Sequence, residues 1–583
     1  MNMAVGMTMM HLHRDDVSLA IYRYGDPALP VVLLVHGYPD SAHTWSDVAK
    51  QLARDYHVVT FDVRGAGQSS RPEATGAYRI ETLADDLAAV IDAAAPGRPV
   101  HLVAHDWGSI QAWEAVCRSD LQARIASFTS ISGPCLDHAG HWLRARLRRL
   151  ALGEVMGQLL RSWYVFFFHL PLLPALLWRA GLARWWPRLM RQVEGARDDG
   201  ATTRAEDGLA GMRLYRANFL RRLWSPQART TQVPVQLLVP AREHYVSTCL
   251  HDDLLLHAPR LWRRSIGGGH WPQLTHPAAT AECISEFIQS IADGEESGVL
   301  RRNRVQSAGR PAPLAGRLAL VTGAGSGIGR EVLLDFATQG AVVVAADINA
   351  EAAERTAMLA RLLGAEAHAF AVDVGNAAAM EAFAWAVEAR LGAPDILVNN
   401  AGIGMAGNFL DTSADDWQRL LGVNLDGVIH GCRLFGRQMV AAGKPGHLIN
   451  LASAAAFSPN RMMSAYATSK AAVFMLGDCL RPEFKAHGIA VTTVCPGFVD
   501  TAISTSIRFV GVSAEEQSRK RRASQQLYRV RNLRPEAVAA AITGAVARPR
   551  AIVLVGTEAW LMRLVNGHAP WLARLLARID PTP

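Results

Sequence analysis

The chain has 583 residues, of which 50% are apolar and 19% are charged, so it can form packed cores and is not disordered. This length exceeds that of one compact domain, so two large domains are expected. The net charge is +8, and its short basic clusters, Arg301, Arg302 and Arg304 and then 519–522, are typical of solvated loops. We expect no nucleic-acid partner.

The N-terminus and the cysteines bear on location. No uninterrupted apolar run reaches the roughly 18 to 20 residues of a membrane span, and the start MNMAVGMTMM lacks the pattern of a secretory signal. The seven cysteines are odd in number, far apart and without a CxxC pair, which predicts neither a disulfide framework nor a metal cluster. A cytoplasmic protein without a metal site is expected.

The first half alternates buried strand patterns with amphipathic helix patterns. Apolar runs at 31–37, 57–65, 100–108, 125–133 and 235–243 predict a largely parallel, buried sheet. Between about 136 and 225 the sequence becomes rich in Arg, Trp and Leu, with prolines at 171, 174 and 187. We interpret this segment as an inserted helical lid.

Asp106 stands where a buried strand passes into the next helix, in VHLVAHDWGS (100–109). Ala104 and Gly108 are the small residues that a sharp elbow requires around a nucleophile. A carboxylate that attacks a saturated carbon forms an ester that an activated water can cleave, whereas a serine would form a stable ether. The expected substrate is therefore an epoxide or an alkyl halide.

The sequence also contains candidates for the other residues that this chemistry needs, in the chain order expected for such a site. The backbone N–H groups of Tyr38 and Trp107 are candidates for an oxyanion hole. His270, in IGGGHWPQLTHP, is the candidate base, and Glu243, after a late strand, would orient its imidazole. Weaker candidates for that acid are Asp137, Asp252 and Asp253.

The motifs HGYP (36–39), DVRGAGQSS (62–70), HDWGS (105–109) and GGGHW (267–271) resemble those of the epoxide hydrolase branch of the α/β-hydrolase superfamily, from residue 15 to about 290. The resemblance implies that two lid tyrosines, Tyr164 and Tyr215, hydrogen-bond the epoxide oxygen. Haloalkane dehalogenases share the aspartate and the following tryptophan but typically carry asparagine at the position of Tyr38. Ala104 and Glu243 depart from the usual glycine and aspartate.

The lid segment from Trp163 to Trp178 is too apolar for an ordinary exposed cover. Its side chains either pack on the hydrolase core, line a channel for a long aliphatic substrate, or rest at a membrane surface. We divide the chain into a hydrolase domain at 1–291, a polar linker at 292–313 and a second domain at 314–583.

The second domain opens with a strand and a glycine-rich turn, LALVTGAGSGIGR. Glycines there let the backbone approach a pyrophosphate at the start of the helix. Asp347 ends the next apolar strand, where a carboxylate accepts the adenosine ribose hydroxyls and repels a 2′-phosphate, so NAD is expected rather than NADP. The candidate residues in the turn are Thr322, Gly323, Ser326, Gly327, Ile328 and Gly329.

Tyr466 and Lys470 lie one helical turn apart, so the ammonium can lower the phenol pKa while Tyr466 exchanges the substrate proton. With Ser453 they match the short-chain dehydrogenase/reductase family from about 315 to 550. The resemblance implies that Ser453 orients the carbinol or carbonyl and that Asn424 holds a relay water. It also places at the cofactor pocket Asp373, Val374, Asn399, Asn400, Pro496, Gly497, Val499 and Thr501.

Together these motifs predict a bifunctional enzyme, an α/β-hydrolase fold followed by a Rossmann-fold dehydrogenase, acting on epoxide and alcohol or ketone substrates that are apolar or lipid-like. The alternatives are a dehydrogenase with a hydrolase-like binding or assembly module, and a dehalogenase in the first half. The tail at 559–579 predicts a helix pair that packs on the fold or on another subunit, or that contacts a membrane surface. A homo-oligomer formed through the dehydrogenase domain, with peripheral membrane contact as an option, is expected.

Overall fold

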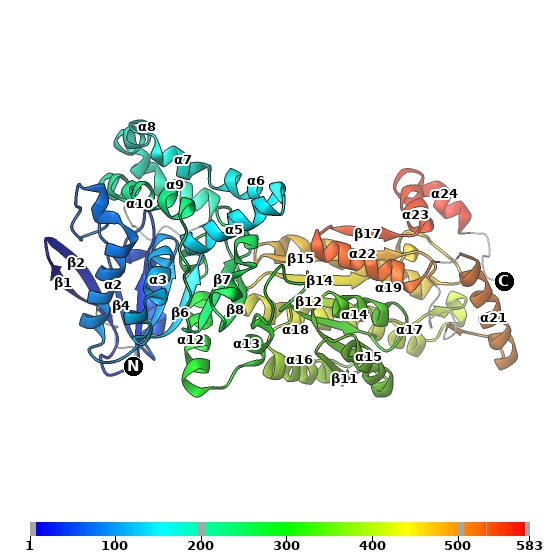
Figure 1. The fold of residues 1–583 in the computed structure, drawn as a ribbon. Helices are drawn as coiled ribbons and strands as arrows, with labels where there is room; N and C mark the ends of the chain where they lie inside the picture. The colour runs from blue at the N-terminus through cyan, green and yellow to red at the C-terminus, as the bar shows by residue number, and fades with distance from the viewer. Residues whose placement is uncertain (1–6, 196–203, 500–506, 532, 578–583) are drawn as a thin grey trace. The chain divides into compact units, whose positions relative to one another are not determined.

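The computed structural model describes residues 7–195, 204–499, 507–531 and 533–577. The chain divides into two compact units, Met1–Pro311 and Ala312–Pro583. Figure 1 shows that each unit is built around a large sheet with helices on both faces. The two predicted α/β folds are therefore confirmed.

The sheet of the first unit is parallel from β4 onward, with an antiparallel edge formed by the first two strands. Its central strands are buried on both faces, which explains why they consist of consecutive valines and leucines. In sheet order the strands are β1 (Thr8–Arg14), β2 (Val17–Tyr24), β4 (His57–Phe61), β3 (Val31–Val35), β5 (Val100–His105), β6 (Ile125–Ile131), β7 (Val235–Pro240) and β8 (Leu261–Ile266).

Helices cover both faces of this sheet and bury its apolar side chains in two clusters. They are α1 (Ser46–Leu52), α2 (Ile80–Ala94), α3 (Trp107–Cys117), α4 (Ser119–Gln122), α11 (Pro272–Thr275), α12 (Pro277–Asp293) and α13 (Gly298–Asn303), with short helices η1 (Ala42–Trp45), η2 (Thr75–Tyr78), η4 (Thr248–His251) and η5 (Leu254–Leu256).

A helical lid separates β6 from β7 (Figure 1). Pro174 stands in the first turn of α8, where a missing N–H costs little, and so helps to break the lid into short helices. Val165 and Trp178 are buried beneath it, whereas Trp163 and Phe166 are exposed. The helices are α5 (Leu136–Arg148), α6 (Leu152–Arg161), α7 (Trp163–His169), α8 (Leu173–Leu177), η3 (Trp178–Leu182), α9 (Ala183–Val193) and α10 (Ala205–Trp224).

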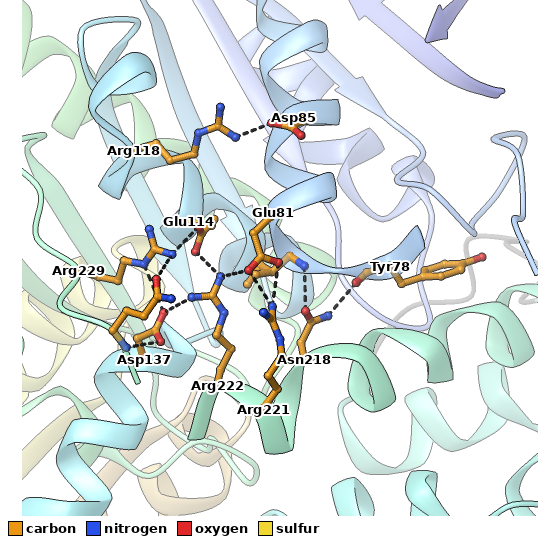
Figure 2. Close-up of polar contacts among 12 residues, drawn as sticks. Tyr78, Glu81, Asp85, Glu114, Arg118, Asp137, Asn218, Arg221, Arg222 and Arg229 are labelled. Carbon is orange, nitrogen blue, oxygen red and sulfur yellow. Dashed lines mark hydrogen bonds and ion pairs between the residues drawn. The ribbon is translucent and has the colours of Figure 1, made fainter. Parts of the chain in front are cut away.

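A buried network of ion pairs attaches α10 to the core (Figure 2). The Arg222 guanidinium is 2.8 Å from Glu81 on α2, 3.1 Å from Glu114 on α3 and 2.9 Å from Asp137 on α5. Arg229 pairs with Glu114 from the other side at 2.8 Å. Arg222 is therefore surrounded by three carboxylates from three helices where the lid returns to the sheet.

The predicted linker at 292–313 requires a correction, because most of it is attached to the first unit. It contains α13, and Leu300 is buried against Trp262. The Gly309 N–H donates a hydrogen bond to the Asp252 carbonyl at 2.8 Å. The polar composition concealed this short helix because a single buried leucine produces no apolar periodicity.

The second unit has a seven-stranded sheet that is parallel throughout, with apolar clusters on both faces. In sheet order the strands are β11 (Ala367–Ala371), β10 (Val342–Asp347), β9 (Leu318–Thr322), β12 (Ile396–Asn399), β14 (Gly446–Leu451), β15 (Ile489–Pro496) and β17 (Ile552–Val555), beside a small pair, β13 (Met405–Ala406) and β16 (Arg508–Phe509). The direction of winding reverses between β9 and β12, which is where open α/β sheets bind ligands.

The helices of this unit are α14 (Gly327–Thr338), α15 (Ala350–Leu362), α16 (Ala377–Leu391), α17 (Ala414–Leu421), η6 (Phe409–Asp411), η7 (Gly422–Asp426), α18 (Gly427–Ala441), η8 (Ala454–Phe457), α19 (Ser464–Lys485), α21 (Ala514–Arg531), α22 (Pro535–Ala547), α23 (Thr557–His568) and α24 (Pro570–Leu576). The basic cluster at 519–522 lies in α21, and Arg301 and Arg302 lie in α13. The expectation that these clusters are loops is therefore wrong.

Candidate active sites

Asp106 occupies the turn between β5 and α3 in a strained backbone conformation, with φ 48° and ψ −122°. The surrounding backbone leaves no room for side chains: a Cβ at Gly108 would lie 2.4 Å from the Val35 carbonyl oxygen, and one at Gly37 would lie 2.5 Å from Asp106 Oδ2. Such strain is found where a side chain must be held exposed to a substrate. The elbow predicted from the sequence is present.

The Asp106 carboxylate is held by groups from two other loops. Tyr38 N–H donates to Oδ2 at 2.9 Å, and His270 Nε2 lies 3.7 Å from Oδ1. If Oδ1 forms an ester, Oδ2 becomes the carbonyl oxygen and already faces a backbone donor. Trp107 begins α3, and its buried ring packs edge-on against Tyr215 at 4.9 Å.

Glu243 lies beside His270 as the sequence predicts. Both of its carboxylate oxygens are 2.9 Å from His270 Nδ1. Ser132 Oγ and Tyr245 N–H also donate to it, at 2.6 and 2.8 Å. Burial opposes the charge, but His270 and these donors outweigh it and lower the pKa of Glu243 to about 2.

The three weaker acid candidates pair with arginines and not with His270. Asp137 belongs to the Arg222 network, and Asp252 and Asp253 face Arg146. Burial lowers the pKa of His270, but the Glu243 and Asp106 carboxylates overcome this effect and raise it to about 10. The imidazolium is thus stabilised while Asp106 is ionised.

Two lid tyrosines lie near Asp106. Tyr164 comes from α7 and Tyr215 from α10, and their ring centroids are 6.0 Å apart. Burial and the nearby Asp106 charge raise the pKa of both phenols well above the ordinary value, so both remain protonated donors. The Tyr38 phenol is already committed, because it donates to the Gly208 carbonyl on α10 at 3.1 Å.

The structure adds two residues that sequence reasoning missed. The Tyr245 ring lies 4.7 Å from the His270 ring and 5.4 Å from that of Tyr164. Glu194, just after α9, is buried against Gly269, and burial raises the pKa of its carboxyl. Tyr245 could have been found from its place two residues after Glu243, whereas Glu194 carries no sequence signal.

In the second unit, the turn between β9 and α14 forms a cradle of bare backbone. A Cβ at Gly329 would lie 2.2 Å from the Gly323 carbonyl oxygen, so this close approach requires glycine. Asn400 Nδ2 donates to the Thr322 and Gly323 carbonyls at 3.0 and 3.1 Å, which fixes the turn. Ser326 is the N-cap of α14, Gly327 begins the helix, and Ile328 packs on the core.

Asp347 ends β10 and faces this turn. Its Oδ2 accepts a hydrogen bond from Gly325 N–H at 2.9 Å, and its Oδ1 accepts one from Asn349 N–H at 2.9 Å. The glycine cradle and the neighbouring carboxylate fit a dinucleotide whose pyrophosphate lies at the start of α14 and whose ribose hydroxyls meet Asp347.

The acid–base residues of the second unit converge on α19. Lys470 Nζ donates to the Leu451 carbonyl at 2.9 Å and lies 5.9 Å from the centroid of the Tyr466 ring. The pKa of Tyr466 is raised, because the effect of burial exceeds the opposing effect of a hydrogen bond with Ser453. Burial lowers the pKa of Lys470 to about 8. Asn424, fully buried in η7, donates to the Ile403 carbonyl at 3.1 Å.

The other predicted pocket residues lie at or just beyond the carboxyl ends of the strands of the same sheet. Asp373 Oδ1 accepts from Gly375 N–H at 2.9 Å, and Val374 is buried against Gly427. Asn399 is buried at the end of β12 and donates to Asn450. Pro496 ends β15, Gly497 N–H donates to the Val555 carbonyl, and Val499 bridges to Leu533. Thr501 lies outside the described residues.

Comparisons with known proteins agree with this division. The alpha/beta hydrolase fold family model matches residues 30–277, and the short chain dehydrogenase model matches 317–509. Probable oxidoreductase EphD of Mycobacterium tuberculosis (strain ATCC 25618 / H37Rv) is 40% identical over 579 residues, 97% of each chain.

Two further proteins match a smaller part of the chain. D-threitol dehydrogenase of Mycolicibacterium smegmatis is 40% identical over 193 residues, 33% of this chain and 73% of that protein. A short chain dehydrogenase/reductase from Burkholderia phymatum, solved in complex with NAD, is 31% identical, covering 46% of this chain and 96% of that chain, with a TM-score of 0.41.

The second unit is thus a short-chain dehydrogenase with a site for a nicotinamide cofactor, and the first is an α/β-hydrolase. Because the likeness to EphD runs across both units, the chain belongs to the family of two-domain enzymes in which an α/β-hydrolase domain precedes a short-chain dehydrogenase domain.

Proposed function

We propose that the first domain hydrolyses epoxides to vicinal diols through an ester on Asp106. The observation that carries this proposal is a carboxylate at a strained elbow, with a His–Glu pair on one side and two buried phenols above it. Asp106 Oδ1 attacks an epoxide carbon, the carbon–oxygen bond breaks, and Tyr164 or Tyr215 protonates the departing oxygen.

Ester formation prepares the second step. It removes the Asp106 charge, and with it part of what holds the His270 pKa at about 10, so the His270 proton passes to the tyrosinate left by the first step and His270 becomes a base. His270 Nε2 then takes one proton from water as the water oxygen adds to the ester carbonyl, and Tyr38 N–H stabilises the oxyanion. Collapse releases the diol with that proton, and the second water proton passes from the Asp106 carboxyl back to His270.

The covalent ester provides the test. A His270→Ala enzyme incubated with epoxides should accumulate an alkyl adduct on Asp106, detected by intact mass and peptide mapping. The double variant His270→Ala/Asp106→Asn is the matched control and should gain no mass. No adduct over a range of epoxides, together with no turnover by the wild type, contradicts the proposal. Halide release from chloroalkanes instead of epoxide opening would assign a dehalogenase.

For the second domain we propose NAD-dependent interconversion of a secondary alcohol and a ketone. Bound nicotinamide supplies hydride transfer. Tyr466 exchanges the hydroxyl proton, Ser453 orients the same oxygen, and Lys470 holds the ribose and favours the phenolate. Asp347 supports NAD, because its carboxylate would face a 2′-phosphate, and a preference of at least tenfold, about 1.4 kcal/mol, is expected. Equal NADP binding by the wild type, or an unchanged ratio in Asp347→Asn, would contradict this assignment.

We infer further that the two reactions act in sequence, since a vicinal diol carries the secondary alcohol that the second domain would oxidise to a hydroxyketone. With epoxide and NAD supplied together, the wild type should form NADH after a lag. Asp106→Ala should form NADH only when diol is added, and Tyr466→Phe should accumulate diol. If Asp106→Ala forms NADH from epoxide as fast as the wild type, the two sites serve different substrates.

We also propose that the protein forms a homo-oligomer through its dehydrogenase domain. Exposed apolar side chains on α23 and α24, among them Trp560, Leu561 and Trp571, support it. Light scattering of the wild type and of Trp560→Ser/Trp571→Ser tests it: a variant of lower mass is expected, and a monomeric wild type would contradict it.

A further inference from the structure

The outer surface of the lid exposes large apolar side chains where a soluble cover would be polar. Trp163 is 62% exposed, Phe166 55% and Leu172 71%, and Leu160 and Leu176 are exposed beside them in sequence. Contiguous exposure of this kind marks an interaction surface. We call the outward side chains of α6 to α9 the lid surface.

These side chains are not surplus core residues, because the same helices have a separate buried face. On α7, Tyr164 and Phe168 face the catalytic site and Val165 is buried, while Trp163 and Phe166 point away from the core. On the segment from α8 to α9, Trp178 and Met190 form the buried face. The lid therefore has an apolar face on each side.

Apart from Glu154 at the start of α6, the charged side chains of the lid surface are all positive. From Val155 to Val193 the sequence contains five arginines and no aspartate or glutamate. All five are exposed: Arg161, Arg179, Arg184, Arg188 and Arg191. Glu154, just before this stretch, is paired with Arg146 at 2.8 Å. Exposed leucines and aromatic residues with only arginines among them are the composition of a helix that lies in an anionic lipid interface.

The geometry favours lying on a bilayer over crossing it. Among the described residues no single helix is long and apolar enough to span a membrane; one pair, Trp163–His169 with Leu173–Val193, meets the test by length and composition but is bent by 94°. Its inner face is occupied by contacts with the catalytic site, so only its outer face is free for lipid.

We propose that the lid surface docks the first domain on an anionic membrane, with Trp163, Phe166 and Leu172 inserted among the acyl chains and the arginines at the phosphates. Docking itself does not depend on the proposed epoxide hydrolysis, but the inference about the substrate does. Because α7 carries Tyr164 above Asp106 on one face and the inserted aromatics on the other, the epoxide would be an apolar one drawn from the bilayer.

Vesicle flotation of the full chain tests docking without any substrate. Vesicles of phosphatidylcholine and phosphatidylglycerol in equal parts should carry the protein upward, and phosphatidylcholine alone should carry much less. Trp163→Ser/Phe166→Ser and Arg184→Gln/Arg188→Gln should each reduce partitioning about tenfold. The control variants should match the wild type: Trp385→Ser/Leu410→Ser, whose side chains on the second domain are even more exposed, and Arg519→Gln/Arg522→Gln.

Unchanged near-ultraviolet circular dichroism shows that each variant is folded. No flotation with anionic vesicles, or equal loss in the controls, overturns the proposal. A lower oligomeric mass in Trp163→Ser/Phe166→Ser with unchanged flotation overturns it in favour of a second copy on this surface. Flotation that depends on the lid in an enzyme that forms no Asp106 adduct would uphold docking and refute only the hydrolytic proposal.

Discussion

At the scale of single residues, the shifted pKa values of His270 and Glu243 predict how the pair's contribution to folding stability depends on pH. The pKa of His270 is raised to about 10 and that of Glu243 is lowered to about 2. Their contribution to folding is therefore complete between about pH 4.5 and 6.5, the two ordinary values, and disappears as the pH rises through 10 or falls towards 2.

A Glu243→Gln substitution should lower the His270 pKa by removing its nearest negative charge. The loss of melting temperature relative to the wild type should be largest near pH 5 to 6.5 and should vanish above about pH 10. NMR titration of the imidazole and calorimetry across pH measure both effects. An unchanged His270 titration would show that Glu243 does not support its charge.

Lys470 is buried within 5.9 Å of the Tyr466 ring centroid, so its ammonium should lower the pKa of the catalytic phenol. Lys470→Met should reduce kcat/KM for alcohol oxidation by about 100-fold and move the acidic limb of the pH profile, where Tyr466 loses its proton, to higher pH. Lys485→Met, on the exposed end of the same helix, should leave both unchanged. A fall in rate without a shift of the profile would assign Lys470 to cofactor binding alone.

At the scale of elements, the attachment of α10 depends on Arg222, whose side chain is 3% exposed. Arg222→Met leaves the Glu81, Glu114 and Asp137 carboxylates without their common partner and should cost about 3 kcal/mol of stability in the first domain. Arg221→Met is the control, because this arginine also pairs with Glu81 but is 44% exposed, and it should cost less than about 1 kcal/mol. Calorimetry compares them, and equal costs would contradict a role for burial.

The strands were predictable because buried parallel strands are continuous apolar runs, and the Asp106 and Asp347 sites because each lies at the end of such a strand. Tyr466 was predictable because Lys470 follows it by one helical turn. Glu194 and α13 were not predictable. Whether a lid residue faces the catalytic site depends on how short helices pack, which periodicity does not encode. The basic cluster at 519–522 likewise lies in a helix with few apolar residues to reveal it.

At the scale of the whole molecule, the connection between the two units is shorter than its composition suggests. Gly309 is still bonded to the first unit, and the second begins at Ala312. A protease of low specificity should cut first between 305 and 313, where most residues are exposed, and should leave two folded fragments. Mass spectrometry of the early products identifies the site. First cleavage inside either described sheet would refute two independently stable units.

Tyr38 joins two parts of the first domain that are 170 residues apart in sequence: its backbone N–H holds Asp106, and its phenol holds the Gly208 carbonyl on α10. The side chain fits closely there, since a Cβ at Gly211 would lie 2.2 Å from its ring. A displacement of α10 relative to the sheet would therefore either break this bond or shift the N–H that holds Asp106. One side chain thus couples the position of the lid to the geometry around the Asp106 carboxylate.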